Sequence, residues 1–354
     1  MVRINAVASV VPSHEVSAEE TGAFLVAHAP EAARSRLLRA LQASGNRTRH
    51  AVLPLDALAQ LGGATERGDL YRTHALALGE RALAGLADRG LLPAERISTV
   101  IFVSSTGWGA PSVETHLSRR FGLDPHCRRI PLTQLGCGGG VAALSLAAEI
   151  ASARPAGRVL VVSIEIPSLQ LQLAEPSYAE LLAAAQFGDG AAAAIVSSNE
   201  RGPEVVGTDS VLLPETEEGG RIVPCETGLR LIASGGLPRL IRSRVRELVD
   251  RCARAHQTDP RTLGFVVVHP RGREVIDAVA DGLSCDRETV AASWAAWERS
   301  GNMVSASIYR ALAELSRAGS PRHGELGMLL AFGTGVACEM ALLRWRSAPA
   351  VVMA

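Results

Sequence analysis

The residues of this sequence that could do chemistry are a cysteine, a histidine and an asparagine, each in a short turn. Cys137 lies in PLTQLGCGGG, and a segment of small apolar residues follows it at once. If that segment is a helix, its free N–H groups and positive dipole end favour a thiolate at Cys137. The glycines would let a substrate approach backbone amides that stabilise an oxyanion. Cys137 is therefore the candidate nucleophile, although most free thiols are simply buried.

Two other turns carry candidate partners for this thiol. His269 ends the apolar segment VVVHPRG, where the carboxyl end of a strand would point its side chain into a cleft. A histidine there can take the thiol proton and form an ion pair with the thiolate. Asn302, in SGNMVSAS, precedes a predicted helix, so on its own it would be interpreted as a helix N-cap.

The elements that must position these residues alternate along the chain. Continuous apolar segments at 98–107, 158–165 and 191–198 are typical of strands buried on both faces of a sheet. Helices are predicted at 18–44, 71–90, 111–121 and 141–152. The alternation of strands and helices predicts an α/β fold.

The second part of the sequence repeats the first. A shift of 165 residues places Cys137 on Asn302 and Ser104 on His269, and aligns LGCGGGVAALSLAAE with SGNMVSASIYRALAE. Equivalent turns of a duplicated chain meet around a pseudo-twofold axis. The repeat therefore predicts that the three polar residues share one site, with Asn302 as a second polar donor rather than only a cap.

A further match sets the boundaries of the repeat. FGDGAAAAIV (187–196) aligns with FGTGVACEMAL (332–342) at a shift of 145, so the first copy holds about twenty extra residues, expected within 166–186. The predicted halves are residues 1–205, which carry the cysteine, and 206–354, which carry the histidine and asparagine.

Composition excludes several classes of function. The 36 basic and 36 acidic residues cancel, so no basic face is expected for nucleic acid or an anionic membrane. Every basic residue is an arginine, and the sequence contains no lysine. Pyridoxal Schiff bases, Ser–Lys hydrolases and Walker phosphate loops all need a lysine amine, so they are excluded.

The cysteines indicate a reducing compartment. Six cysteines are scattered without paired spacing, which predicts reduced thiols in a cytoplasmic protein rather than disulfides or a metal site. The N-terminal apolar segment is short and is interrupted by Pro12, unlike a signal peptide. No apolar stretch is expected to be long enough to span a membrane.

One rival motif points to another class of enzyme. GCGGGV, followed by a strand that ends in Glu165, imitates the dinucleotide-binding turn of an NAD(P)-dependent oxidoreductase and its ribose carboxylate. The match fails where Val141 stands in place of the third glycine, and it leaves the repeat unexplained. The oxidoreductase remains an alternative from a different class.

Taken together, these segments resemble the type III polyketide synthases, the chalcone-synthase-like enzymes of the thiolase superfamily. PLTQLGCGGG, VVVHPRG and SGNMVSAS resemble the family's cysteine, histidine and asparagine segments, and QFGDGAAAAIV and AFGTG resemble two further family blocks. The resemblance covers nearly the whole chain. SIEIPSLQLQ is similar to microbial alkylpyrone and alkylresorcinol synthases rather than to plant chalcone synthases.

This resemblance implies a thiolase-like fold, in which two related α/β halves form a layered α-β-α-β-α core. It also implies a homodimer that uses acyl-CoA and malonyl-CoA as substrates and needs no cofactor or metal. Cys137 would carry the starter, while His269 and Asn302 would promote malonyl decarboxylation and stabilise the enolate. Repeated condensation would then end in cyclisation to a pyrone or resorcinol-type product. The nearest alternative is a single-round 3-oxoacyl-ACP synthase of the fatty-acid type.

The resemblance also carries over substrate-binding positions. Phe187 matches the family's gate phenylalanine, and Leu231 stands where a second gate phenylalanine is usual. Arg36 and Arg39 fall where the family has basic contacts to coenzyme A phosphates, whereas Ala43 takes the third such place. The family's GFGPG loop reads AFGTG, with a threonine in place of its proline, and the resemblance implies that Gly335 of this loop binds substrate.

Overall fold

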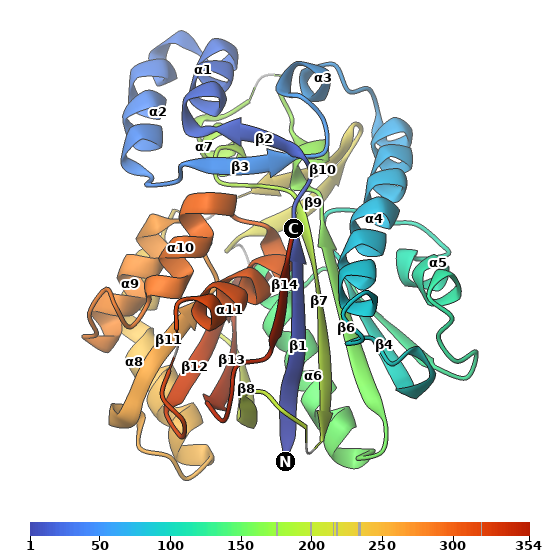
Figure 1. Ribbon diagram of the computed structural model, residues 1–354. Coiled ribbons are helices and arrows are strands. Elements are labelled where there is room, and N and C mark those ends of the chain that lie inside the picture. Colours follow the sequence, from blue (N-terminus) through green and yellow to red (C-terminus); the bar gives the residue numbers. More distant parts are fainter. Residues whose placement is uncertain (175, 199, 215, 217–218, 233–234, 320) are drawn as a thin grey trace.

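The computed structural model describes residues 1–354 except 175, 199, 215, 217–218, 233–234 and 320, and is built around one large twisted sheet (Figure 1). The strands of the sheet lie in the order β11-β12-β13-β8-β1-β7-β6-β4-β5, and β14 pairs with β1 in parallel. The strands are β1 (Val2–Val10), β4 (Ile97–Val103), β5 (Arg128–Leu132), β6 (Arg158–Glu165), β7 (Gly190–Ser198), β8 (Glu204–Leu212), β11 (Leu263–Val268), β12 (Leu326–Phe332), β13 (Ala337–Arg344) and β14 (Ala350–Met353).

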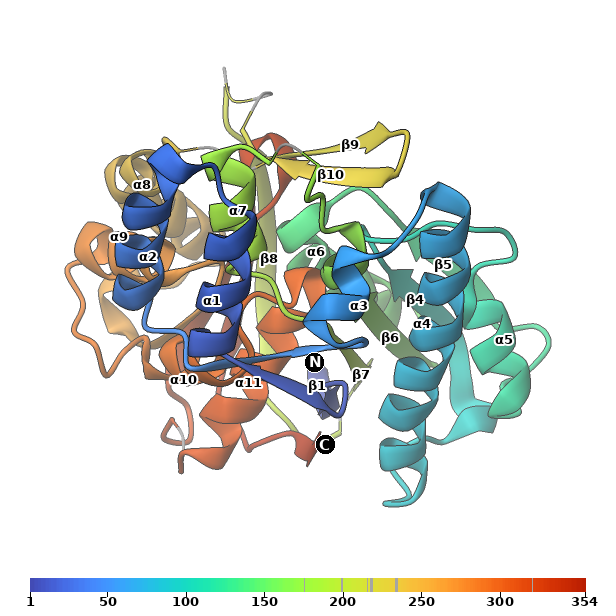
Figure 2. The same cartoon turned by 90° about the horizontal axis from the view of Figure 1, so that it is seen from above.

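Helices separate the two halves of this sheet and cover both outer faces (Figures 1 and 2). The middle layer holds α6 and α11, which contact strands of both halves. Helices α4 and α5 cover the outer face of the first half, and α8, α9 and α10 cover that of the second. These helices are α4 (Ala64–Ala87), α5 (Val113–Arg120), α6 (Gly139–Ala153), α8 (Leu237–Ala255), α9 (Arg273–Leu283), α10 (Ala291–Ser300) and α11 (Ser307–Arg317).

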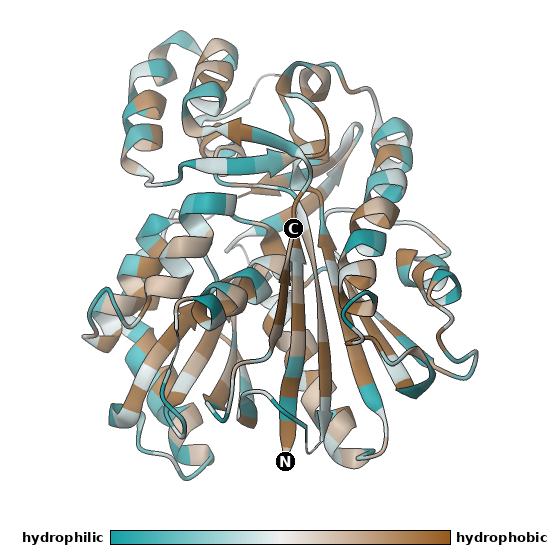
Figure 3. Cartoon of the chain, in the orientation of Figure 1, coloured by the Kyte–Doolittle hydropathy of each residue, from teal (hydrophilic) through white to brown (hydrophobic). Residues whose placement is uncertain are grey.

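Three hydrophobic clusters fill the spaces between these layers. One joins α6 and α11 to strands of both halves, the second joins α4 to the first half, and the third joins α8, α9 and α10 to the second half. Figure 3 shows hydrophobic residues along the strands and hydrophilic residues on the outer helices. The alternating layers confirm the predicted α-β-α-β-α core. Strand β7 is buried along nearly its whole length and is rich in alanine, so helices can pack closely against it.

The topology confirms the duplication seen in the sequence. Strand order β4-β6-β7-β1 in the first half corresponds to β11-β12-β13-β8 in the second. The 165-residue shift superimposes the ends of β4 and β11, since Val103 corresponds to Val268. The division at residue 205 stays a prediction, because β8 begins at Glu204 and pairs with β13 of the second half.

Smaller elements form a cap over one end of the layers (Figure 1). The twenty extra residues predicted within 166–186 contribute to this cap as a 3₁₀ turn and α7. The cap consists of β2 (His14–Ser17), α1 (Ala18–His28), α2 (Glu31–Ala43), β3 (Thr48–Ala51), α3 (Leu55–Ala59), α7 (Tyr178–Ala184), β9 (Arg221–Cys225) and β10 (Gly228–Ile232).

Two predicted helices differ in their limits. The helix predicted at 18–44 is two helices, because Pro30 lacks an N–H and forces a break after α1. The helix predicted at 71–90 begins earlier, at Ala64. Its first turn is charged, and the apolar periodicity by which a helix is predicted begins only later in the sequence. The strand predicted at 98–107 ends at Val103, where the chain turns toward the site.

The expectation that no apolar stretch could span a membrane was too strict. Residues 136–153 reach the required length and composition, but 56% of this segment is buried inside the protein. The segment is chiefly α6, a helix of the middle layer, and among the described helices it alone is long and apolar enough to cross a membrane. All six cysteines are free thiols in the structure.

Candidate active site

Cys137 lies at the junction between the two halves. It belongs to a 3₁₀ turn, Gly136–Gly138, that runs directly into α6, and its side chain is buried. Gly136 has φ +55°, a conformation that favours glycine, and its N–H donates to the Ser105 hydroxyl. A Cβ on Gly138 would come within 3.2 Å of the Gly333 Cα, so the cysteine turn also needs glycine to pack against the second half.

Asn302 reaches the thiol from the equivalent turn of the second half. Its Oδ1 accepts a hydrogen bond from the Val304 N–H at 2.9 Å, and the Cys137 Sγ lies 3.8 Å from Nδ2 and 3.9 Å from Oδ1. The backbone of Asn302 is tied to the cap, since its N–H donates to the Gln186 carbonyl and its carbonyl accepts from the Gly188 N–H. Helix α11 begins at Ser307, so Asn302 is not its N-cap.

His269 is held by the same peptide segment. Its Nε2 lies 2.7 Å from the Val304 carbonyl oxygen, and since a carbonyl only accepts, Nε2 carries the proton. The other ring nitrogen, Nδ1, is buried and has no hydrogen-bond partner in the described part of the chain. In the neutral ring Nδ1 is therefore a free base. Val304 itself has φ +46°, a strained conformation for a β-branched residue, and its peptide groups contact both His269 and Asn302.

The electrostatics single out Cys137 as a nucleophile. Burial alone would raise the pKa of the Cys137 thiol, but the charge of His269, the charge of Arg271 and the hydrogen bond of Asn302 together lower it. Burial instead raises the pKa of four other thiols, Cys127, Cys252, Cys285 and Cys338. A lowered pKa increases the thiolate fraction, which is the reactive form.

Arg271 is the residue that the sequence analysis missed. It follows His269 by two positions and lines the same cavity as Cys137 and Asn302. Its position in HPRG was the one available signal, but a residue in a turn can point into the cavity or into solvent, and the sequence does not distinguish the two.

Phe187 and Leu231 lie between two cavities. Both side chains line the cavity that contains Cys137 and also a second, largely apolar cavity beneath the cap. Phe187 is placed by a bridge between its backbone and that of Asn302. This position, between a catalytic cavity and its neighbour, is what a gate requires.

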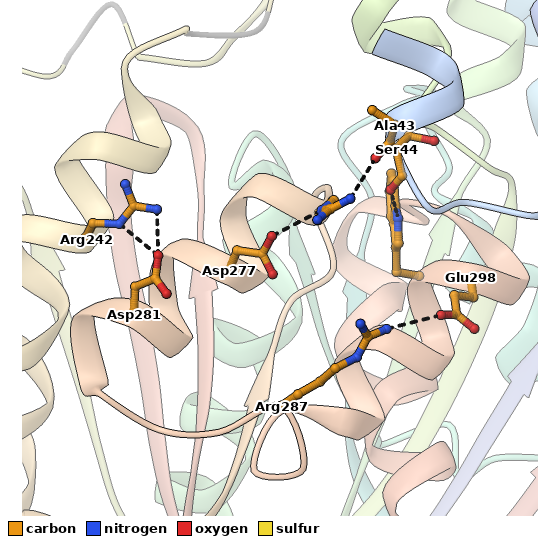
Figure 4. A network of polar contacts seen from close by, with 9 residues as sticks. Ala43, Ser44, Arg242, Asp277, Asp281, Arg287 and Glu298 are labelled. Carbon is orange, nitrogen blue, oxygen red and sulfur yellow. Dashed lines mark hydrogen bonds and ion pairs between the residues drawn. The ribbon is translucent and has the colours of Figure 1, made fainter. Parts of the chain in front are cut away.

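The other predicted substrate-binding residues lie away from the thiol. The Arg36 guanidinium stacks on the Tyr178 ring at 4.1 Å, and Arg39 is exposed on α2. Arg273, at the start of α9, donates to the Ala43 carbonyl at 3.2 Å and so reaches the end of α2 (Figure 4). Gly335 lines a separate surface cavity rather than that of Cys137.

The carboxylate of the rival dinucleotide-binding motif, Glu165, is hydrogen-bonded inside the protein. Glu165 is buried and accepts hydrogen bonds from the Ser105 and Thr106 N–H groups and from the Thr106 and Ser305 hydroxyls. Burial raises its pKa to about 7. A side chain so enclosed is not available to a ribose, so the oxidoreductase alternative loses its acidic residue. Within the described ranges, no group of three or more His, Cys, Asp or Glu side chains could hold a metal ion.

Comparisons with known proteins cover both halves of the chain. Residues 6–200 match the family model of chalcone and stilbene synthases, N-terminal domain. Residues 253–345 match the model of the 3-oxoacyl-[acyl-carrier-protein] synthase III C terminal.

Individual proteins match over most of their length. A 1,3,6,8-tetrahydroxynaphthalene synthase of Streptomyces peucetius subsp. caesius is 35% identical over 324 residues, which are 89% of this chain and 85% of the relative. The α-pyrone synthesis polyketide synthase-like Pks18 of Mycobacterium tuberculosis (strain H37Rv) is 31% identical, over 86% of this chain and 81% of its own. The crystal structure of a 1,3,6,8-tetrahydroxynaphthalene synthase from Streptomyces coelicolor A3(2), a bacterial type III polyketide synthase, has a TM-score of 0.92 at 31% identity and covers 98% of this chain and 100% of that one.

Proposed function

The chain belongs to the chalcone and stilbene synthase family of type III polyketide synthases, and we propose that Cys137, His269 and Asn302 perform its condensation chemistry on coenzyme A thioesters. It is an acyl-transferring condensing enzyme that acts iteratively. The single-round alternative is set aside, because the 3-oxoacyl synthase model matches only residues 253–345, while full-length relatives are polyketide synthases.

Loading of the starter begins from a thiolate–imidazolium pair. The Cys137 thiolate attacks the carbonyl carbon of an acyl-CoA, the bond from that carbon to the coenzyme A sulfur breaks, and the departing thiolate takes a proton from solvent. An acyl thioester on Cys137 results. His269 keeps its extra proton on Nδ1, since Nε2 already donates to the Val304 carbonyl.

The extender unit is then activated by the two donors that remain. The protonated ring of His269 and the Asn302 Nδ2 hold the thioester carbonyl oxygen of malonyl-CoA. As carbon dioxide leaves, the electron pair of the broken C–C bond forms an enolate, whose negative oxygen these donors stabilise.

Condensation restores the resting site. The enolate carbon attacks the acyl group on Cys137, a C–C bond forms, and the C–S bond to Cys137 breaks, which releases the thiolate. The extended 3-oxoacyl-CoA reloads Cys137 for the next round, and the finished chain cyclises to a pyrone or resorcinol-type product.

One observation carries this proposal: turns from the two halves bring Cys137 and Asn302 to the wall of one cavity, and the charge of the neighbouring His269 and the hydrogen bond of Asn302 lower the thiol pKa. The carbonyl and the N–H of Val304 set the orientation of the two partners. An oriented base and donor beside an activated thiol are what acyl loading followed by enolate formation requires.

The proposal puts the coenzyme A phosphates at the end of α2. Arg39 is exposed there, and Arg273 brings a second guanidinium to the backbone of Ala43, the place where the family's third basic contact is absent. Arg36 contributes less directly, because its charge lies over the Tyr178 ring. The proposal includes a cytoplasmic location, which the free thiols favour.

The active form is proposed to be a homodimer. Strand β5 forms an edge of the sheet, paired among the described strands with β4 alone, and it leads directly into the Cys137 turn. Trp108, which lines a surface cavity with Thr133 and Gln134 just after β5, is 50% exposed, which is unusual for so large an apolar side chain. A second copy of the chain that covers this face would bury both features.

The test is covalent capture followed by turnover. Purified protein is incubated with a panel of acyl-CoA starters, and the mass of the Cys137 peptide is measured before and after malonyl-CoA is added. We expect an acyl adduct on Cys137 that disappears as pyrone or resorcinol products form. Cys137→Ala should give neither adduct nor product, while Cys252→Ala, a buried thiol of raised pKa, should retain both. An adduct on the Cys137→Ala variant would contradict the assignment.

A further inference from the structure

Arg271 places a positive charge inside the catalytic cavity. Its guanidinium lies against Gly220, where an added Cβ would come within 2.8 Å of Nη2. Gly220 has φ +71°, so this position favours glycine, and the absence of a side chain there leaves room for the arginine. The cavity wall is thus shaped around the guanidinium, which lines the space shared by Cys137 and Asn302.

This charge lacks a carboxylate partner in the part of the chain that the structure describes. Other arginines of the second half are paired: Arg242 with Asp281 and Arg273 with Asp277 (Figure 4), and also Arg251 with Asp209. A partly buried guanidinium that faces a ligand cavity without a counter-ion is suited to bind an anion, and its planar donors match a carboxylate.

Two carboxylates could enter this cavity: that of the malonyl extender, and one at the far end of the acyl group on Cys137. Decarboxylation moves the negative charge of the extender from its carboxylate to the thioester oxygen. An ion pair with Arg271 would stabilise the starting carboxylate more than the transition state, so it would slow this step. A carboxylate at the far end of the acyl group on Cys137 is kept throughout the reaction, so its ion pair with Arg271 would not slow decarboxylation.

We propose that Arg271 selects a starter acyl group that ends in a carboxylate, as in a dicarboxylic acyl-CoA, and holds that carboxylate while Cys137 carries the thioester. This inference rests on the proposed function, because it assumes acyl loading on Cys137. The methylenes between the two ends would lie against Phe187, Ile222 and Leu231, which are among the apolar residues that line the same cavity.

The experiment compares starters of equal carbon number. Loading of Cys137 is followed by intact-protein mass for succinyl-CoA against butyryl-CoA, and for glutaryl-CoA against pentanoyl-CoA. A charged hydrogen bond in a partly buried site should favour the dicarboxylic starter in kcat/KM by ~10- to 100-fold. Arg271→Leu should abolish this preference, and Arg271→Lys should keep part of it. Arg242→Leu, which removes a surface arginine of the second half, should leave it unchanged.

The remaining outcomes separate this inference from the proposed function. Absence of an adduct with every thioester would refute the proposed function itself. Adducts formed equally well from both members of each pair would overturn only the role of Arg271. If Arg271→Leu slowed all starters equally and raised the pH needed for alkylation of Cys137, the arginine would merely support the thiolate, and selection of a carboxylate would be wrong. Faster malonyl decarboxylation in Arg271→Leu would instead assign the arginine to the extender.

Discussion

The peptide groups of Val304 set the geometry of the two groups that would act on the thiol and the enolate. Its carbonyl fixes the proton of His269 on Nε2, and its N–H turns the amide of Asn302 so that Nδ2 faces Cys137. The strained φ of +46° at this residue is the backbone conformation that presents both groups. Orientation at the site therefore comes from the main chain and not from further side chains.

The thiol should react at a lower pH than an ordinary cysteine. Because the folded protein lowers the pKa of Cys137, the thiolate persists as pH falls until that lowered pKa is reached. The rate of alkylation by iodoacetamide, measured against pH, should show its midpoint below that of a free thiol. In His269→Ala the first stabilising charge is lost, so the midpoint should rise.

The Asn302→Ala variant should separate malonyl-CoA decarboxylation from the loading of the starter on the Cys137 thiol. Malonyl-CoA decarboxylation should fall by about 10²- to 10³-fold, the usual effect of losing one oxyanion donor. Starter loading should fall less, because His269 still maintains the thiolate. His269→Ala should impair both steps. Loss of loading alone in both variants would contradict the division of roles. The measurements are carbon dioxide release and adduct mass.

At the scale of elements, the cysteine and asparagine turns can meet because α6 approaches the second half very closely. A Cβ on Gly140 would come within 2.2 Å of the Ser305 carbonyl oxygen, and the Gly140 carbonyl accepts a hydrogen bond from Tyr309 at 2.7 Å. The first contact joins α6 to the turn that leads into α11, and the second joins α6 to α11 itself. The small residues of the helix are therefore part of how the site is assembled.

Gly140→Ala should destabilise the protein, since the clash is with backbone that cannot rotate away. Overpacking of this kind costs about 1–3 kcal/mol in the free energy of unfolding, measured by denaturant titration. Gly68→Ala is the matched control, a helical glycine of α4 with no atom within 4 Å of its added Cβ. That change should stabilise by about 0.5–1 kcal/mol. Equal effects at the two positions would refute the close-approach argument.

Most elements and the duplication could be predicted because strand periodicity and glycine turns are local features. The predicted limits of β6, 158–165, equal the observed ones. The shift that aligns Cys137 with Asn302 in the sequence matches two turns that lie together in the structure. Arg271 could not be found, since its direction depends on the space left by Gly220, about fifty residues away in the sequence. Long-range packing of this kind leaves no periodic signal.

At the scale of the whole molecule, the proposed dimer gives a direct prediction. Sedimentation velocity should show a species of twice the chain mass. Trp108→Arg should shift the protein toward monomer, because a charge would be buried at the covered face. Leu38→Arg, a similar change at an exposed leucine on α2, should leave the dimer intact. A monomeric wild type would rule out this arrangement.

The fold also explains why the site needs the entire chain. One turn comes from between β5 and α6, two come from the ends of β11 and α10, and the cap closes over them. Each half supplies a sheet and one helix of the middle layer, so neither half covers its inner face alone.

The contacts of Val304 with both His269 and Asn302 affect how this enzyme could evolve. Two functional side chains that are bound to the backbone of one residue cannot be optimised separately, because a substitution that shifts the Val304 backbone displaces both. Double-mutant cycles between this turn and His269 should therefore show strong epistasis. The cavity wall, by contrast, is formed by side chains from several separate elements, among them Phe187 and Leu231. New specificities would arise most readily at that wall, while the turn remains fixed.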